Sequence, residues 1–284
     1  MNALRTVPGI ALSAILLVTP GLAAGQVIRS ASGVSAASIT PTRDQFRTDL
    51  GGGTTAGANG SFGGLRREIN WDGVPAASSA PNLLAANFFN TVSPRGVIFA
   101  TPGTGFQVSG ATADSGAGQP AAADFGNIDV TYTATFATFT AQRLFTPLAS
   151  TITDVNFFLP GTNTPALTKG FGAVFSDVDN VNTTSIQFFN SANVSLGTFF
   201  VPAMAGSETF SFLGVSFPTA SVARVRITSG NFSLQSGGTD QNGAGRDVVV
   251  MDDFIYGEPA VVSPVMQGAA SRKVHGAAAL NLPL

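Results

Sequence analysis

Short segments in which apolar and polar residues alternate recur along this chain, and they constrain its fold more than any other feature. Between Ser221 and Thr228, Val225 and Ile227 share one face of an extended chain while Arg224 and Arg226 share the other. A period of two is typical of a β-strand with one buried and one polar face. The chain is therefore expected to be built from strands.

Turn-forming residues separate these segments and leave little room for helices. Pro160-Gly161, Asn190 and Gly206-Ser207 supply the fixed or positive φ that tight connections need. A parallel α/β sheet would require a helix between successive strands, so it is the poorer fit. We predict an all-β domain over residues 65–259, a two-sheet antiparallel jelly-roll-like β-sandwich. Its other expected strands are Gly96–Thr101, Thr131–Phe136, Thr151–Phe158, Gly170–Phe175, Thr183–Phe188, Val194–Val201, Glu208–Phe217 and Asp247–Tyr256.

Residues 1–24 have the three parts of a secretory signal peptide. Arg5 precedes the apolar run Ile10–Val18, and small residues surround the expected cleavage point after Ala24. The run is too short to cross a bilayer, so we expect no transmembrane segment in the mature chain. The expected location is secreted, extracellular or on the cell surface.

Two regions of weaker pattern flank the predicted sandwich. Residues 25–64 are rich in Gly, Ala, Ser and Thr, and we expect a flexible lead-in with one short helix at Thr42–Leu50. Residues 260–284 are expected to form a disordered tail.

The composition sets how such a domain is stabilised and which partners it excludes. With no cysteine there are no disulfide bonds, so an apolar core must suffice. The 23 Phe residues supply that core, each worth roughly 1.5 to 3 kcal/mol when buried. The formal net charge is only -2, and basic residues do not cluster beyond Arg66-Arg67. Nucleic acid is therefore not an expected partner.

The segment Arg66–Pro75 is a first candidate calcium site. Glu68, Asn70 and Asp72 share one face of an extended chain there. Calcium binds carboxylate and carbonyl oxygens without demanding rigid geometry. The alternative is an edge strand whose polar face is solvated.

A second candidate calcium site is the pair Asp252 and Asp253 in an otherwise apolar strand. Neighbouring strand residues point to opposite faces, so one of the two must be buried unless a bulge intervenes. A buried carboxylate needs a cation, backbone amides, or an arginine such as Arg67 or Arg246. Structural Ca²⁺ at Glu68, Asp72, Asp252 and Asp253 is the only cofactor expected.

Two other acidic loops give weaker signals. The segment Asp177–Asn182 is more typical of an Asx-rich turn than of a metal site. In Gly237–Asp247, Asp240 and Asn242 match the first and third positions of a calcium loop, but later positions do not fit a helix-loop-helix site.

No set of residues identifies a reaction. The single histidine, His275, cannot build a histidine zinc site or complete a convincing catalytic triad from the tail. Glycosidase chemistry needs only two carboxylates at a set separation, so it stays open. Its candidate carboxylates are Glu68, Asp72, Glu208, Asp252 and Asp253.

Four segments carry a resemblance to known proteins: Arg67–Gly73 (REINWDG), Ser93–Val97, Gly170–Asp177 and Val250–Pro259, which contains MDDFIYGEP. On these motifs the chain resembles a family of exported bacterial β-sandwich proteins. It is similar to exosortase-sorted, PEP-CTERM-like proteins, whose sandwich ends in an Asp-Asp-Phe strand. The resemblance implies secretion and a jelly-roll-like domain, and it implies no activity.

Together these observations favour an exported, non-catalytic β-sandwich with a binding, adhesion or structural role at the cell surface or in an extracellular matrix. Its expected partner is a glycan or a cell-surface protein. The alternative is a polysaccharide-active enzyme, a glycoside hydrolase or lyase, that uses paired carboxylates.

Overall fold

The computed structural model describes residues 25–52, 65–111, 123–241 and 245–261. The predicted signal peptide, the glycine-rich part of the lead-in (53–64) and the tail beyond 261 lie outside the described residues. Within the described part of the chain, no helix is both long and apolar enough to cross a membrane.

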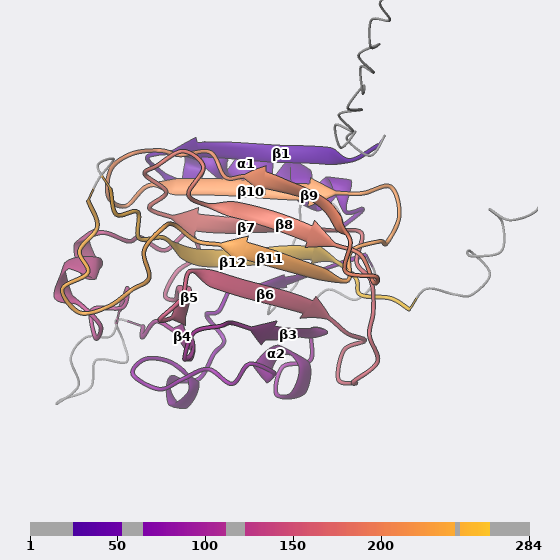
Figure 1. Ribbon diagram of the computed structural model, residues 1–284, viewed down its shortest axis with the longest axis horizontal. Helices are drawn as coiled ribbons and strands as arrows, with labels where there is room; N and C mark the ends of the chain where they lie inside the picture. The colour runs from indigo at the N-terminus through magenta and orange to yellow at the C-terminus, as the bar shows by residue number, and fades with distance from the viewer. Residues whose placement is uncertain (1–24, 53–64, 112–122, 242–244, 262–284) are drawn as a thin grey trace, which may run out of the picture.

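The described strands form two antiparallel sheets that stack face to face (Figure 1). One sheet has seven strands, in the order β1-β10-β7-β12-β5-β4, with β2 also pairing with β12. The other has five strands, in the order β3-β6-β11-β8-β9. The two-sheet antiparallel sandwich is thus confirmed, and the jelly-roll connectivity stays a prediction. The strands are β1 (Val27–Gly33), β2 (Arg66–Ile69), β3 (Val97–Ala100), β4 (Gly105–Val108), β5 (Phe145–Leu148), β6 (Ile152–Phe157), β7 (Gly170–Ser176), β8 (Ser185–Phe189), β9 (Ser195–Phe200), β10 (Phe210–Ser216), β11 (Arg224–Thr228) and β12 (Val250–Gly257).

The main core fills the space between the two sheets. Phe171 and Phe175 of β7 and Phe254 of β12 project into it from the seven-stranded sheet. Phe188 of β8 and Val225 of β11 meet them from the five-stranded sheet. This is the alternation that the sequence pattern requires, because β6, β8 and β11 of the five-stranded sheet bury every second residue.

Where a flexible lead-in with a short helix at Thr42–Leu50 was expected, the described residues form an edge strand and a longer packed helix that overlaps the expected one. Strand β1 pairs with β10, and helix α1 (Ala36–Asp49) covers the outer face of the seven-stranded sheet (Figure 1). The ring of Phe46 lies over Gly172 and Gly214, which are paired across β7 and β10. The absence of side chains on these two glycines makes room for the ring, a relationship that composition alone cannot reveal.

The expected strand Thr131–Phe136 is a short 3-10 helix, Val130–Ala134. The carboxylate of Asp129 accepts a hydrogen bond from the backbone N–H of Thr131, which caps the turn. Tyr132 and Phe136 then point the same way and belong to a small separate core with Leu144. Local capping therefore overrode the strand pattern. The other described helices are the 3-10 helix Ala76–Ser78 and α2 (Phe88–Thr91).

Candidate functional site

The Asp252–Asp253 pair lies in a β-bulge of β12, where the register to β7 shifts between Met251 and Phe254. Both aspartates are buried, with 0% and 2% of their surface exposed. The hydroxyl oxygen of Thr140 lies 3.0 Å from a carboxylate oxygen of each. The bulge therefore turns two consecutive side chains toward the same group, which a regular strand would not do.

Both carboxylates of this pair already form hydrogen bonds or an ion pair with other groups of the protein. Asp252 Oδ2 accepts hydrogen bonds from the backbone N–H groups of Phe139 (2.6 Å) and Thr140 (3.3 Å). Asp253 pairs with Arg43 at 3.5 Å, rather than with the Arg67 or Arg246 that we considered. Burial, and then the charge of Asp253, raise the pKa of Asp252 well above its usual range.

Glu68 faces helix α1 rather than solvent. Its carboxylate accepts two hydrogen bonds from Arg47, at 2.7 and 2.5 Å, and one from Arg66 Nε at 2.9 Å. With only 4% of its surface exposed, Glu68 contradicts the solvated polar face considered for this strand. Two arginines satisfy the buried charge.

Asp72 lies just beyond β2, where Asn70 Nδ2 donates to its Oδ2 at 3.3 Å. Its other oxygen, Oδ1, is buried and accepts no hydrogen bond from the described ranges. Burial, and then the charge of Asp253, raise the pKa of Asp72 to about 6. Burial raises the pKa of Asp253, and the charge of Glu68 adds to this effect. The four predicted ligands thus share one acidic region, and the calcium site that we expected there stays a prediction.

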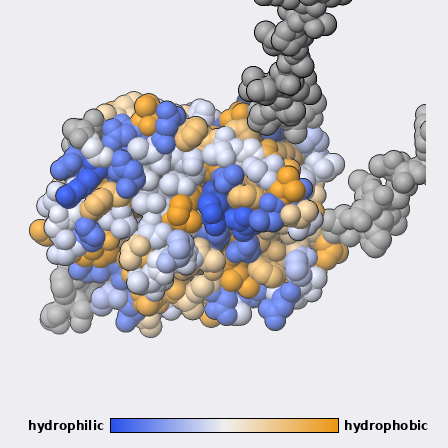
Figure 2. Space-filling model, viewed as in Figure 1, coloured by the Kyte–Doolittle hydropathy of each residue, from blue (hydrophilic) through white to orange (hydrophobic). Residues whose placement is uncertain are grey.

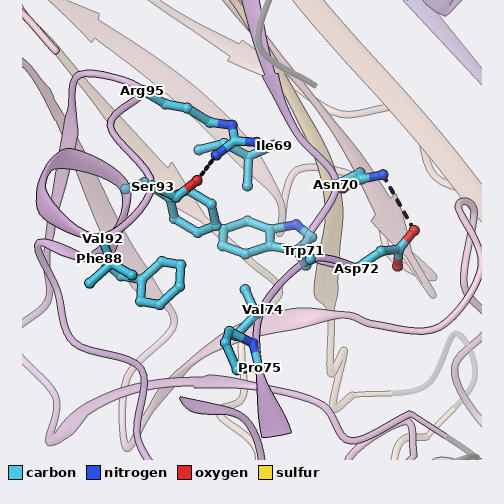
Figure 3. A pocket seen from close by; sticks show the side chains of 12 residues that line it. Ile69, Asn70, Trp71, Asp72, Val74, Pro75, Phe88, Val92, Ser93 and Arg95 are labelled. Carbon is cyan, nitrogen blue, oxygen red and sulfur yellow. Dashed lines mark hydrogen bonds between the residues drawn. The ribbon is translucent and has the colours of Figure 1, made fainter. Parts of the chain in front are cut away.

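A pocket of about 360 Å³ opens beside the same segment (Figure 3). Its lining includes Trp71, Phe88 and Val92, and Arg95 donates to the hydroxyl of Ser93 at its edge. The side chains of Asn70 and Asp72 lie on the other side of the backbone from the indole of Trp71. The pocket therefore does not gather the predicted carboxylates into one cavity.

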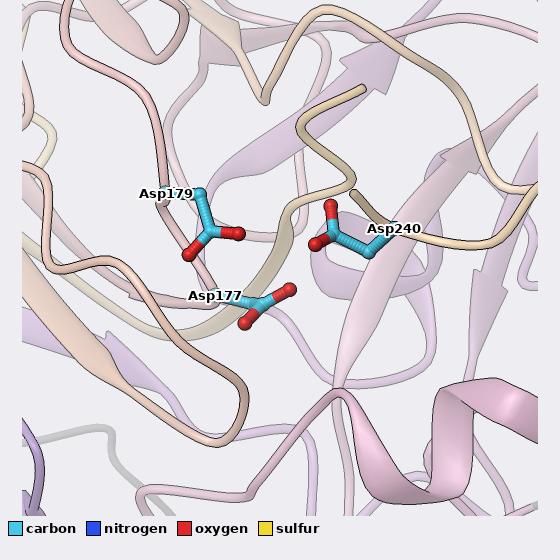
Figure 4. Close-up of side chains that lie close together, drawn as sticks. All are labelled: Asp177, Asp179 and Asp240. Atoms are coloured by element: carbon cyan, nitrogen blue, oxygen red, sulfur yellow. The ribbon is translucent and has the colours of Figure 1, made fainter. Parts of the chain in front are cut away.

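Three aspartates from the two weaker acidic loops meet at a different place (Figure 4). Asp177 and Asp179 follow β7, and Asp240 lies in the connection that precedes β12. One oxygen from each lies within 4.8 Å of the others, and no other set of three or more carboxylates, imidazoles or thiols in the described ranges is as close. Sequence reasoning noted both loops but could not pair them, because more than 60 residues separate them.

The outer face of the five-stranded sheet presents a polar surface. In Figure 2, which shows the same side of the molecule as Figure 1, hydrophilic residues gather within this face and apolar residues border them. Arg226 pairs across the sheet with Asp154 on β6 and Gln187 on β8, and Arg224 pairs with Asn156 and Phe189 on the same strands. Two rows of outward side chains therefore cross the sheet in register.

Ion pairs and stacking fix the arginines of this face. Arg226 donates to both oxygens of Asp154, at 2.9 and 2.8 Å, and Arg224 donates to Oδ1 at 2.7 Å. The guanidinium of Arg224 lies 3.8 Å from the ring centre of Phe189. Although burial opposes ionisation, hydrogen bonds from Arg226 and Arg224 lower the pKa of Asp154. Two cations and one anion leave this part of the face positive.

No family model and no curated protein matches this chain. Among solved structures, it is similar to the enzymatically active domain of tailspike protein 4 from bacteriophage CBA120. The identity is 10%, the TM-score is 0.23, and the match covers 62% of this chain and 20% of that one. The chain thus spans about a fifth of the tailspike structure, and a likeness this low supports no statement about fold or function.

Proposed function

We propose that this protein is an exported, non-catalytic β-sandwich that binds an acidic polysaccharide through the outer face of its five-stranded sheet. The role is one of adhesion or structure at the cell surface or in an extracellular matrix. The observation that carries the proposal is the double row of outward polar side chains around Arg224 and Arg226.

The geometry of these rows suits an extended, hydroxyl-rich chain. Neighbouring strands lie about 4.8 Å apart, so side chains in register recur at that interval across the sheet. Asn156 and Gln187 offer amide donors and acceptors beside the arginines. Since Asp154 and the planar ring of Phe189 already hold both guanidinium groups, binding costs little side-chain entropy.

The positive charge of the face favours an acidic ligand over a neutral one. Arg226 keeps 43% of its side chain exposed while pairing with Asp154, whose side chain is only 14% exposed. A guanidinium so placed can donate to a uronate carboxylate of the ligand. The apolar border adds contact area, with Phe200 on β9 52% exposed.

Three of the five candidate carboxylates give the glycosidase alternative little support. Glu68, Asp252 and Asp253 are buried, and arginines, backbone amides or Thr140 hold their oxygens. A general acid or nucleophile must instead reach the glycosidic bond. The exposed polar side chains of this molecule therefore fit a binding role better than a catalytic one.

The experiment is titration calorimetry of the purified protein with polygalacturonate, with neutral dextran as the comparison. We expect binding of polygalacturonate only, weakening as salt is added. Arg226→Gln should reduce the affinity roughly tenfold or more, because a hydrogen bond to a charged group contributes about 1.5–3 kcal/mol. Arg29→Gln is the matched control, since it removes one partly exposed arginine from β1 in the other sheet.

Two results would overturn this proposal. If Arg29→Gln weakened binding as much as Arg226→Gln, overall charge rather than the face would be responsible. Release of shortened sugar products, lost on replacing one carboxylate, would establish the enzyme instead.

Export is tested separately by N-terminal sequencing of the secreted protein, which should begin at Gly25.

A further inference from the structure

The three aspartates that converge between β7 and β12 include one whose carboxylate has no hydrogen-bond partner among the described residues. Asp177 is 0% exposed, and both of its carboxylate oxygens are buried without a hydrogen bond from this part of the chain. An unsatisfied buried carboxylate is costly, so a cation or bound protons must compensate for it. In Figure 4 the Asp177 carboxylate points toward those of Asp179 and Asp240.

The surrounding backbone orients the other two carboxylates. Asp179 Oδ1 accepts a hydrogen bond from the N–H of Gly206 at 2.7 Å, and Asp240 Oδ1 accepts one from the N–H of Val248 at 2.9 Å. Asp179 is 6% exposed, so the group is largely shielded from solvent. Two oriented carboxylates therefore face the unpartnered one.

A fourth aspartate, Asp247, holds the loop that carries this group. Its oxygens accept hydrogen bonds from the N–H groups of Asp179 (3.0 Å) and Asn180 (3.4 Å) and from the hydroxyl of Thr183. The same loop is thereby fixed to the start of the segment that leads into β12. Outer partners of this kind position ligands in metal sites.

From this geometry we infer that Asp177, Asp179 and Asp240 hold one Ca²⁺ ion, which joins the connection after β7 to the connection before β12. All donors are carboxylate oxygens, which hard cations prefer. Two oxygens bound to one calcium at 2.3–2.6 Å lie at most about 5.2 Å apart, and the three oxygens here lie within 4.8 Å of one another. This inference is independent of glycan binding.

The electrostatic surroundings agree with this assignment. Burial, and then the charges of Asp240, Asp179 and Asp247, raise the pKa of Asp177 to about 9. Without a cation, the group can persist near neutral pH only by holding protons. A divalent ion removes that penalty and leaves a small net charge.

The test is titration of the full-length protein with CaCl₂ after EDTA treatment and desalting, followed by calorimetry and by thermal unfolding. We expect one Ca²⁺ per chain and a higher Tm in calcium. Asp177→Asn and Asp240→Asn should each weaken binding on the order of 100-fold, because even outer-shell changes cost 10–100-fold. Asp49→Asn is the control, since it changes a carboxylate at the end of α1 that pairs with Arg29 and should leave affinity unaltered.

Two further measurements separate lost binding from lost folding. In calcium-free buffer, Asp177→Asn should unfold at the same temperature as the wild type or higher, because it removes an unsatisfied buried acid. Terbium should bind in place of calcium and be sensitised by Tyr132, whose hydroxyl donates to the carbonyl of Gly238, two residues before Asp240, at 2.8 Å. Tyr132→Phe should dim this luminescence and leave calcium affinity within a few-fold.

Three results would overturn the inference. One is the absence of both calcium binding and a calcium-dependent Tm. Another is calcium binding that survives Asp177→Asn but is lost in Asp253→Asn, which would place the ion on β12. Equal affinity for Mg²⁺ would show that the ion is not calcium.

Discussion

Arg47 and Glu68 form a buried, two-pronged salt bridge between helix α1 and strand β2, with Nε–Oε1 and Nη2–Oε2 distances of 2.7 and 2.5 Å. The side chains are 9% and 5% exposed. The pair joins a helix from the N-terminal region to the strand that carries the REINWDG motif. It therefore makes the helix part of the sandwich.

Replacing Arg47 should destabilise the protein strongly, because it leaves a buried carboxylate with one arginine fewer. We expect Arg47→Met to lower the free energy of unfolding by about 3 kcal/mol, measured by urea denaturation. Arg29→Met is the control, since the Arg29–Asp49 pair is more exposed and should cost about 1 kcal/mol or less. Equal losses in the two variants would refute this account.

Gly214 should not tolerate a methyl group. A Cβ there would come within 2.7 Å of the Phe46 ring, so Gly214→Ala should cost about 1–3 kcal/mol by overpacking. Combining it with Phe46→Leu should cost less than the sum of the two single changes, since both act on one contact. Additive losses in thermal unfolding would show that the ring does not press on this strand.

The Asp154 ion pairs predict a loss of stability in acid. The folded protein lowers the pKa of Asp154 below the unfolded value of about 3.9. The stabilisation that ionised Asp154 adds to the free energy of unfolding is therefore complete above about pH 4. It is lost as the pH falls through the lower pKa of the folded protein. Asp154→Asn should cost about 1 kcal/mol at pH 7, allowing for solvent screening, and the difference should shrink below pH 4. Gln187→Ala should leave the pH profile unchanged.

Trp71 is the single tryptophan, and its indole is buried and stacked on Phe145 with ring centres 4.1 Å apart. Its Nε1 donates to the carbonyl of Asp252 at 2.5 Å. We expect native emission typical of a buried indole, insensitive to added iodide. Trp71→Phe should cost about 2–3 kcal/mol, from the cavity and the unsatisfied carbonyl. Ready quenching of the native protein would show that the indole is exposed.

Local patterns predicted the strands that carry one apolar face. The alternation of Val225 and Ile227 with Arg224 and Arg226 corresponds to β11, where burial follows the same period. The pattern was misleading where a local interaction competed, as at the Asp129 cap of the 3-10 helix. It predicted a short helix at Thr42–Leu50 that overlaps α1, but it did not predict how the helix packs, because the signal for the packing is the pair of glycines under Phe46.

The sequence by itself determined that this chain forms strands with an aromatic core, because side-chain direction in a strand follows from local geometry alone. Only the tertiary structure decided which acidic residues meet. A bulge directs Asp252 and Asp253 toward Thr140. Glu68 forms a salt bridge with Arg47 of helix α1. The folded chain also places Asp240 beside Asp177 and Asp179. These pairings depend on register and on contacts between distant segments, which no local pattern encodes.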